Sequence, residues 1–173
     1  MKIFWLALGI CCMTFCQVRS QDIHLISNAL LDGPEAMTYD QQMALYIVGN
    51  ANNGKILTID SLENISVLKD SLGSHMILTF EILGDSLFVS TNNPQAFYCL
   101  DKNTGDLIYK INLDTISIGF AQMAMDSMTN YIYIAHQSGK IFKVNPYSQT
   151  CSLFANSGIS STSQTLEVDE GNQ

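Results

Sequence analysis

The sequence predicts an all-β fold made of small sheets of four antiparallel strands. The first observation is a hairpin pattern at Thr129–Pro146, where two short apolar segments flank a tight turn. The second is that altered copies of this text occur twice upstream. The third is that no segment longer than a turn shows helical periodicity. Repeated short strands joined by polar turns are typical of propeller blades, so we predict a β-propeller.

The repeats have a regular period. The strands that begin at Leu45, Leu87 and Ile132 are spaced by 42 residues (45 to 87) and 45 residues (87 to 132). A period in the low forties is that of a four-stranded blade. The aligned segments are Gly33–Asp60, Met76–Asp101 and Phe120–Asn145.

The strands of each repeat have distinct patterns. The second strand (LYIVG, LFVS or IYIAH) is apolar on both faces, as expected of a strand covered by neighbouring blades on either side. Asp40 and Asp126 precede it as starters of Asx-type turns, and Gly54 and Gly139 suit the following hairpin turn. The expected outer strands are Ile65–Leu68, Leu107–Ile111 and Ser152–Phe154.

The repeats define the expected domain organisation. We predict a signal peptide at 1–20 and a partial β-propeller at 21–173, with blades at approximately 30–70, 75–113 and 118–156 and the start of a fourth at 160–173. Gln164–Asp169 matches Glu35–Asp40 and Ala121–Asp126 position for position. Because ring closure takes roughly four to eight blades, we expect this chain of about three and a half blades to be the N-terminal portion of a longer protein. The alternative is that it closes its ring with another copy.

The N-terminus has the pattern of a secretory signal. Lys2 is followed by the apolar run Ile3–Met13, and Val18 and Ser20 occupy the −3 and −1 positions of a cleavage site. We therefore expect cleavage near Ser20 and a secreted or periplasmic protein; the alternative is a buried N-terminal strand or helix. Since no other long apolar run exists, we expect no membrane insertion after cleavage.

Charge and cysteine content exclude several classes. Without Lys2 and Arg19, 6 of the 8 basic residues remain against 16 acidic ones, a formal charge of −10. Such a chain repels phosphate backbones, so we expect no nucleic-acid partner. Of the two cysteines after residue 20, Cys99 and Cys151, we favour two separate buried thiols over a disulfide. The sequence contains neither the GxSxG motif of serine hydrolases nor a glycine-rich phosphate-binding motif of nucleotide-binding proteins, so neither function is indicated.

The first repeat resembles a known family of propellers. Pro34-Glu35-Ala36-Met37, then Asp40, then Leu45-Tyr46-Ile47-Val48 is similar to the first blade of the NHL and gluconolactonase/regucalcin-like six-bladed propellers, above all their exported bacterial branch. The resemblance covers Gly33–Gln173. It implies the fold, but these motifs are shared by propellers of many unrelated functions.

The resemblance also implies a possible metal site. Lactonases of that family hold a divalent cation, calcium or zinc, in the central channel, and Glu35 matches their first-blade ligand. The later blades depart from the pattern, with Ala121 and Gln122 in the third, Gln164 in the fourth, and Leu78-Thr79-Phe80 in the second. One carboxylate does not make a metal site.

Candidate ligand-binding residues follow the second strand of each repeat. Asn50, Asn52, Asn92 and His136 are expected in loops at one mouth of the propeller, where ligands usually bind. The competing interpretation is that the asparagines suit turns and that His136 is structural. Our first hypothesis is an exported, non-catalytic module without a cofactor that binds a protein or carbohydrate. The alternative is a metal-dependent lactonase that uses Glu35.

Overall fold

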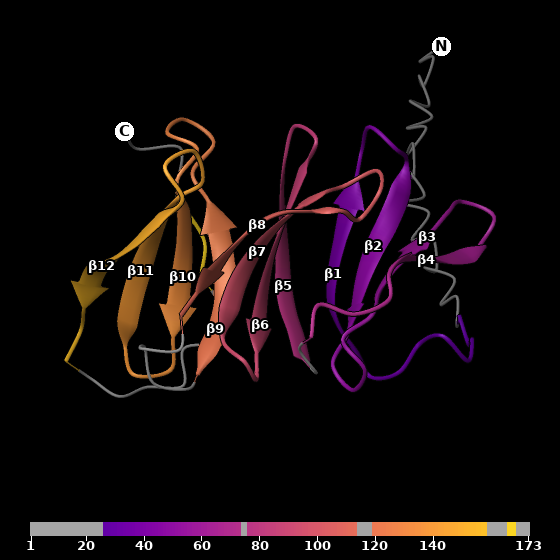
Figure 1. Cartoon of the computed structure of the whole chain (residues 1–173), viewed down its shortest axis with the longest axis horizontal. Coiled ribbons are helices and arrows are strands. Elements are labelled where there is room, and N and C mark those ends of the chain that lie inside the picture. The colour runs from indigo at the N-terminus through magenta and orange to yellow at the C-terminus, as the bar shows by residue number, and fades with distance from the viewer. Residues whose placement is uncertain (1–25, 74–75, 114–118, 159–165, 169–173) are drawn as a thin grey trace, which may run out of the picture.

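Three four-stranded antiparallel sheets stand side by side along the molecule (Figure 1). The computed structural model describes residues 26–73, 76–113, 119–158 and 166–168. Within these ranges the chain forms strands and turns and no helix. The prediction of an all-β fold with four-stranded propeller blades is confirmed.

Each sheet is a simple meander in chain order. The first sheet contains β1 (Pro34–Asp40), β2 (Leu45–Asn50), β3 (Ile56–Ile59) and β4 (Ile65–Lys69). The second contains β5 (Met76–Leu83), β6 (Ser86–Asn92), β7 (Ala96–Asp101) and β8 (Leu107–Asn112). The third contains β9 (Phe120–Met125), β10 (Ile132–His136), β11 (Lys140–Asn145) and β12 (Thr150–Asn156). β1, β5 and β9 are the neighbouring first strands, since β5 contacts both β1 and β9.

The core lies between the sheets. Successive residues of a strand point to opposite faces, so Leu87 packs with the first sheet and Phe88 packs with the third. Phe97, on the neighbouring β7, stacks on Phe88 with ring centroids 5.5 Å apart. The apolar character of these strands on both faces is therefore explained by coverage from two sides, as the sequence predicted.

The backbones of the first two sheets approach closely at Gly49. A Cβ atom at this position would lie 2.4 Å from Cγ2 of Ile77 and 2.9 Å from Cζ of Phe80. Because such distances are shorter than any van der Waals contact, the position excludes side chains. The glycine lets β2 and β5 pack against each other.

The turns follow the predicted chemistry. The carboxylate of Asp40 accepts backbone N–H bonds from Gln42 and Met43, and that of Asp126 accepts them from Met128 and Thr129. These bonds satisfy turn amides that have no strand partner. At the same edge of each sheet, Asp60, Asp101 and Asn145 do the same for the turns before the outer strands.

The pairing register corrects one detail of the repeat alignment. Tyr46, Leu87 and Ile132 each pair with the last apolar residue of the next strand: Ile59, Leu100 and Val144, respectively. The first-repeat equivalent of Leu87 and Ile132 is therefore Tyr46, whereas the sequence alignment had placed Leu45 there. Two repeats still look similar when their sequences are aligned one residue out of register. In a strand, however, a shift of one residue moves every side chain to the opposite face of the sheet.

A buried ion pair joins the first two sheets. Nζ of Lys102 lies 2.9 Å from Oδ2 of Asp40, with side chains only 3% and 2% exposed. Nζ also donates a 2.7 Å hydrogen bond to Oε1 of Gln42. Burial of the Asp40 carboxyl raises its pKa, but the bonds from Lys102 and from the two turn amides outweigh it, and the pKa lies below the usual value.

Candidate functional site

The candidate ligand-binding residues lie at one edge of the sheets. This edge, called the rim below, comprises residues 30–35, 50–55, 91–96 and 136–140. Backbone bonds tie its loops to the neighbouring strand entries: Ala51 N donates to Gly33 O at 2.7 Å, and Gln137 N donates to Gly119 O at 2.7 Å. The rim loops are therefore anchored to the sheets.

One register position at or next to the end of the second strand holds a turn anchor in all three sheets. By register, the equivalent residues are Asn50, Thr91 and His136, and all three are buried. Each bonds to the turn that follows it: Asn50 Nδ2 to Asn53 Oδ1, Thr91 Oγ1 to Pro94 O, and His136 Nδ1 with Ser138 Oγ. This supports the structural interpretation of Asn50 and His136.

Asn50 also ties the N-terminal segment to the rim. Its Nδ2 donates to the backbone oxygen of Leu30 at 2.8 Å. Its Oδ1 is buried and accepts no hydrogen bond from the described part of the chain. A buried acceptor without a donor is unfavourable by about 1–3 kcal/mol.

The neutral tautomer of His136 follows from its partners. The backbone N–H of Ser138 donates to Nδ1 at 3.0 Å, so this nitrogen is the acceptor and the ring proton belongs on Nε2. The ring packs edge-on against Phe142, with centroids 5.9 Å apart. The imidazole is part of the packed hairpin.

Asn52 and Asn53 form the exposed polar cluster of the rim with Asp32. Asn52 Nδ2 donates to Asp32 Oδ1 at 2.9 Å, and Asn53 Nδ2 donates to Asp32 Oδ2 at 3.2 Å. Asp32 and Asn52 are exposed and Asn53 is half-buried. The sequence predicted Asn52 here, but not Asp32, which precedes the repeats and is brought in by the loop before β1.

Asn92 lies at the same edge of the second sheet. It is half-buried, its Oδ1 accepts a 3.4 Å bond from Nε2 of Gln95, and its Nδ2 lies 4.0 Å from Sδ of Met76. Ligand binding by Asn50, Asn52, Asn92 and His136 stays a prediction.

Glu35 lies at the entrance of β1. It is exposed, at an irregularity of the β1–β2 register between Pro34 and Ala36. Within the described ranges no group of three or more His, Cys, Asp or Glu side chains is placed to hold a metal ion. A metal site at Glu35 stays a hypothesis.

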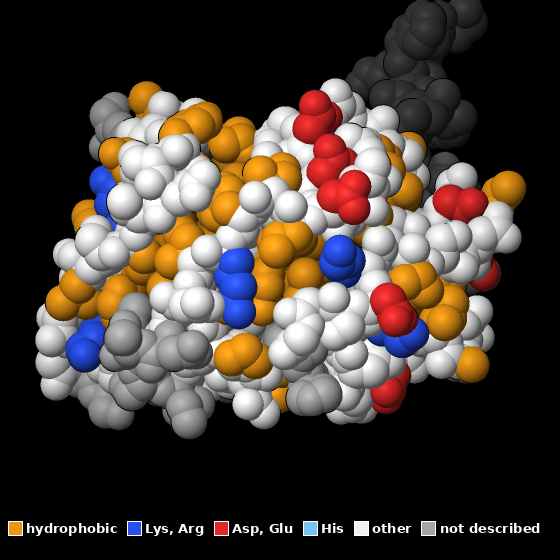
Figure 2. Space-filling model, in the orientation of Figure 1, with side chains coloured by type: hydrophobic (Ala, Val, Ile, Leu, Met, Phe, Trp, Pro, Cys, Tyr) orange, Lys and Arg blue, Asp and Glu red, His pale blue; other side chains and the backbone are white. Residues whose placement is uncertain are grey.

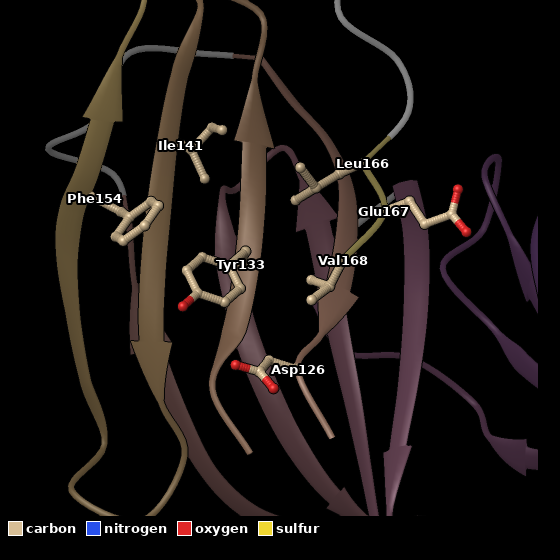
Figure 3. Close-up of a pocket in the computed structure, with 7 residues that line it drawn as sticks. All are labelled: Asp126, Tyr133, Ile141, Phe154, Leu166, Glu167 and Val168. Atoms are coloured by element: carbon tan, nitrogen blue, oxygen red, sulfur yellow. The ribbon is translucent and has the colours of Figure 1, made fainter. Parts of the chain in front are cut away.

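The structure adds a pocket that the sequence did not predict. It measures about 270 Å³ and lies between the third sheet and residues 166–168 (Figure 3). Leu166 and Val168 point toward Tyr133, whereas the carboxylate of Glu167 points away (Figure 3). The backbone N–H of Leu166 donates to Oε1 of Gln122 at 3.4 Å. Residues 166–168 alternate between apolar and acidic side chains. This alternation is the pattern expected of an extended segment with one side against the sheet.

One carboxyl between the sheets has a raised pKa. Glu81, on β5, has a pKa of about 7 because burial disfavours its charged form, although a bond from the backbone of Met125 opposes this effect. Met125 belongs to β9, so the carboxyl bridges the second and third sheets.

A second cavity of about 400 Å³ opens between the same two sheets, near β8 and the turn after β11. Its lining includes Cys99 and Tyr109, and Tyr109 donates to the backbone oxygen of Pro146 at 3.0 Å. Cys99 and Cys151 are free thiols, of which Cys99 is buried and Cys151 is half-buried, and burial raises the pKa of Cys151 to about 11. Among the residues that the structure covers, no helix is long and apolar enough to cross a bilayer.

Three solved structures with a similar fold are β-propeller proteins. No protein-family model matches the sequence. No curated protein matches it. A streptogramin B lyase structure has a TM-score of 0.63 and 13% identity and covers 74% of this chain. BamB from Moraxella catarrhalis has a TM-score of 0.55 and 20% identity and covers 72% of this chain. The Neurospora crassa Pan2 WD40 domain has a TM-score of 0.58 and 13% identity and covers 73% of this chain.

This chain spans less than half of each neighbour, namely 42%, 37% and 39% of their lengths. Identities this low carry information on fold and not on activity. The three sheets of this chain therefore have the β-propeller fold.

Proposed function

We propose that this protein is an exported β-propeller module that binds a polar ligand, a protein or a carbohydrate, at the rim. The observation that carries the proposal is the cluster of Asp32, Asn52 and Asn53. Two side-chain hydrogen bonds hold these groups in place at the surface. Preorganised polar groups bind with a smaller loss of side-chain entropy than mobile ones.

The chemistry of this cluster suits a ligand rich in hydroxyl or amide groups. Each asparagine side chain offers both donors and acceptors, and the Asp32 carboxylate adds acceptor capacity. Loops on a rigid scaffold are where propellers and other repeat folds bind their partners. The acidic character of the chain argues against phosphate-rich partners.

The experiment is a binding assay with matched variants. The purified protein is applied to an array of glycans and to an extract from the source compartment, and captured ligands are identified. Asn52→Ala is expected to weaken capture at least about tenfold, the effect of roughly one or two lost hydrogen bonds, and Asn92→Ala tests the neighbouring loop. Neither is expected to lower the melting temperature by more than about 2 °C.

Asn64→Ala is the matched control. Asn64 is likewise an exposed amide that donates to a carboxylate, Oδ2 of Asp60 at 2.9 Å, but it lies at the opposite edge of the first sheet. Capture that tolerates substitution at both Asn52 and Asn92, or that falls equally in the control, would place the ligand elsewhere.

Export is the second part of the proposal, and it rests on residues 1–20, which lie outside the described residues. N-terminal sequencing of the protein produced in a secreting host is expected to begin at Gln21. A mature chain that retains Met1–Ser20 contradicts export by cleavage.

The lactonase hypothesis makes an opposite prediction about metal. If the hypothesis holds, calcium or zinc binds the folded protein and not the unfolded chain, and it therefore raises the melting temperature. Glu35→Ala is then expected to abolish this rise. We expect no such rise in differential scanning fluorimetry with either ion, for the wild type or the variant. A rise that Glu35→Ala removes would favour the enzyme.

A further inference from the structure

We propose that the cavity between the second and third sheets binds a small amphipathic cation, whose apolar ring enters the cavity and whose ammonium group stays at the entrance. The cavity measures about 400 Å³, and ligand pockets generally measure roughly 300–1,000 Å³. It lies at the edge opposite the rim, because its lining comes from the β5–β6 turn, the start of β8 and the turn after β11. The inference goes beyond the proposed function, since it concerns a different site and a different ligand.

The walls of the cavity are mainly apolar and aromatic. Leu83 and Phe88 belong to the second sheet, whereas Pro146 and Tyr147 follow β11 of the third sheet. Tyr109, on β8, joins the two sides, since its hydroxyl donates to the backbone oxygen of Pro146 at 3.0 Å. The two walls are therefore tied together next to the cavity.

The position of the cavity is independent of the outer faces of the stack. Its lining comes only from the second and third sheets, which contact each other directly through β5 and β9. A further sheet at either end of the stack would pack on an outer face of the first or the third sheet. The edge between the second and third sheets would stay as it is.

The polar side chains that line the cavity are uncharged at neutral pH. Burial raises the pKa of the Cys99 thiol and of the Tyr109 hydroxyl above their ordinary values. Hydrogen bonds with Ser86 and Tyr109 oppose this effect on Cys99 without reversing it. An uncharged and mainly apolar interior favours the apolar part of a ligand over its charged part.

Exposed apolar side chains mark the entrance. Ile108 and Tyr147 line the cavity and are exposed by 55% and 71%. Leu107, next to Ile108, is also exposed. Because the face of a tyrosine ring attracts cations, Tyr147 offers a contact both for an apolar ring and for an ammonium group beside it.

Carboxylates lie close to this entrance. Asp85 adjoins the lining residue Ser86, and Asp101 pairs with Ser86 between β6 and β7. Asp106 lies two positions before the lining residue Ile108. Asp85 and Asp106 are exposed, and Figure 2 shows acidic side chains gathered at this edge of the second sheet. The field at the entrance therefore attracts cations and repels anions.

The four lysines of the second and third sheets lie away from the entrance. Lys102 is buried in the ion pair described above. Nζ of Lys110 lies 5.2 Å from the ring centroid of Tyr98, which packs toward the first sheet. Lys143 lies over aromatic rings on the outer face of the third sheet, and Lys140 belongs to the rim. Since none of the four lines the cavity, they leave the negative charge at its entrance uncompensated.

The test uses three probes that share an indole ring and differ in charge. Tryptamine carries an ammonium group, indole is neutral, and indolepropionate carries a carboxylate. In isothermal titration calorimetry at low salt, tryptamine is expected to bind with a dissociation constant below about 1 mM and at least about tenfold more tightly than indole. Indolepropionate is expected to bind most weakly. An ionic strength of about 0.5 M is expected to remove most of the preference for tryptamine, because salt screens exposed charges.

Substitutions at the entrance locate the binding site. The double variant Asp85→Asn with Asp106→Asn is expected to weaken tryptamine binding at least about fivefold and to leave indole binding unchanged. Tyr147→Ala is expected to weaken the binding of both probes at least about threefold, because it removes an aromatic wall. Circular dichroism checks that each variant folds, and Ile108→Ala replaces Tyr147→Ala if that variant does not.

Glu63→Gln and Leu62→Ala are the matched controls. Both residues are exposed in the β3–β4 turn, at the same edge but in the first sheet. Each control is expected to keep both affinities within about twofold of the wild type. The proposal would be overturned by tryptamine that does not bind at about 1 mM, by equal binding of the three probes, or by affinities that the entrance variants leave unchanged or that the controls reduce equally.

Discussion

At the scale of single residues, the structure assigns several polar side chains a role in packing. His136 was a candidate ligand-binding residue, and its Nδ1 accepts the backbone N–H of Ser138. Asn50 bonds to Leu30 and to Asn53. Both residues end a second strand, where the chain must turn and its polar groups need partners. Asn52 differs, because it is exposed and bound to Asp32.

Glu81 makes the stability of the molecule depend on pH. Its pKa is about 7 in the folded protein, against an ordinary value of 4.5. The folded state thus holds its proton more tightly than the unfolded state, so this group lowers stability as pH rises from about 4.5 to 7 and not further above that. Glu81→Gln is expected to stabilise the protein at pH 8 by about 1–2 kcal/mol, a value reduced for partial exposure of the carboxyl.

Urea denaturation of the wild type and the glutamine variant at pH 5 and pH 8 checks this. The two proteins are expected to differ at pH 8 and to be nearly equal at pH 5. Parallel dependence of both proteins on pH would show that Glu81 is not the titrating group.

At the scale of elements, the hairpins depend on a few turn residues. Gly139 has a φ of +76° in the β10–β11 turn, and Gly54 has +68° at the equivalent place in the first sheet. This left-handed conformation is unfavourable for residues with a Cβ atom by about 1–2 kcal/mol, and asparagine tolerates it best. The position of these glycines between apolar segments is what allowed both hairpins to be predicted.

Gly139→Ala is therefore expected to lower the free energy of unfolding by about 1 kcal/mol or more, with Gly139→Asn costing less. Chemical denaturation of both variants measures the difference. An alanine variant as stable as the asparagine variant would contradict the conformational explanation.

At the scale of the whole molecule, the contacts between sheets hold the stack together. Asp40 ends β1 of the first sheet, Lys102 lies in the turn after β7 of the second sheet, and their side chains are almost fully buried. Removing one partner leaves the other charge buried without its counter-charge, which typically destabilises a protein by about 3–5 kcal/mol. Lys102→Met is expected to have an effect of this size.

The double variant Lys102→Met with Asp40→Asn is the control, since it removes both charges. It is expected to recover part of the lost stability in thermal and urea unfolding. Equal losses in the single and double variants would show that the ion pair contributes only through packing.

The sequence by itself determined the blade architecture, because strand periodicity, Asx turns and hairpin glycines such as Gly139 act over a few neighbouring residues and repeat along the chain. Only the tertiary structure decided the register of Tyr46, the meeting of Asp32 with Asn52, and the ion pair of Asp40 with Lys102. The two side-chain contacts join residues 20 or more positions apart, and the register depends on which faces of the strands meet, so no local pattern encodes them.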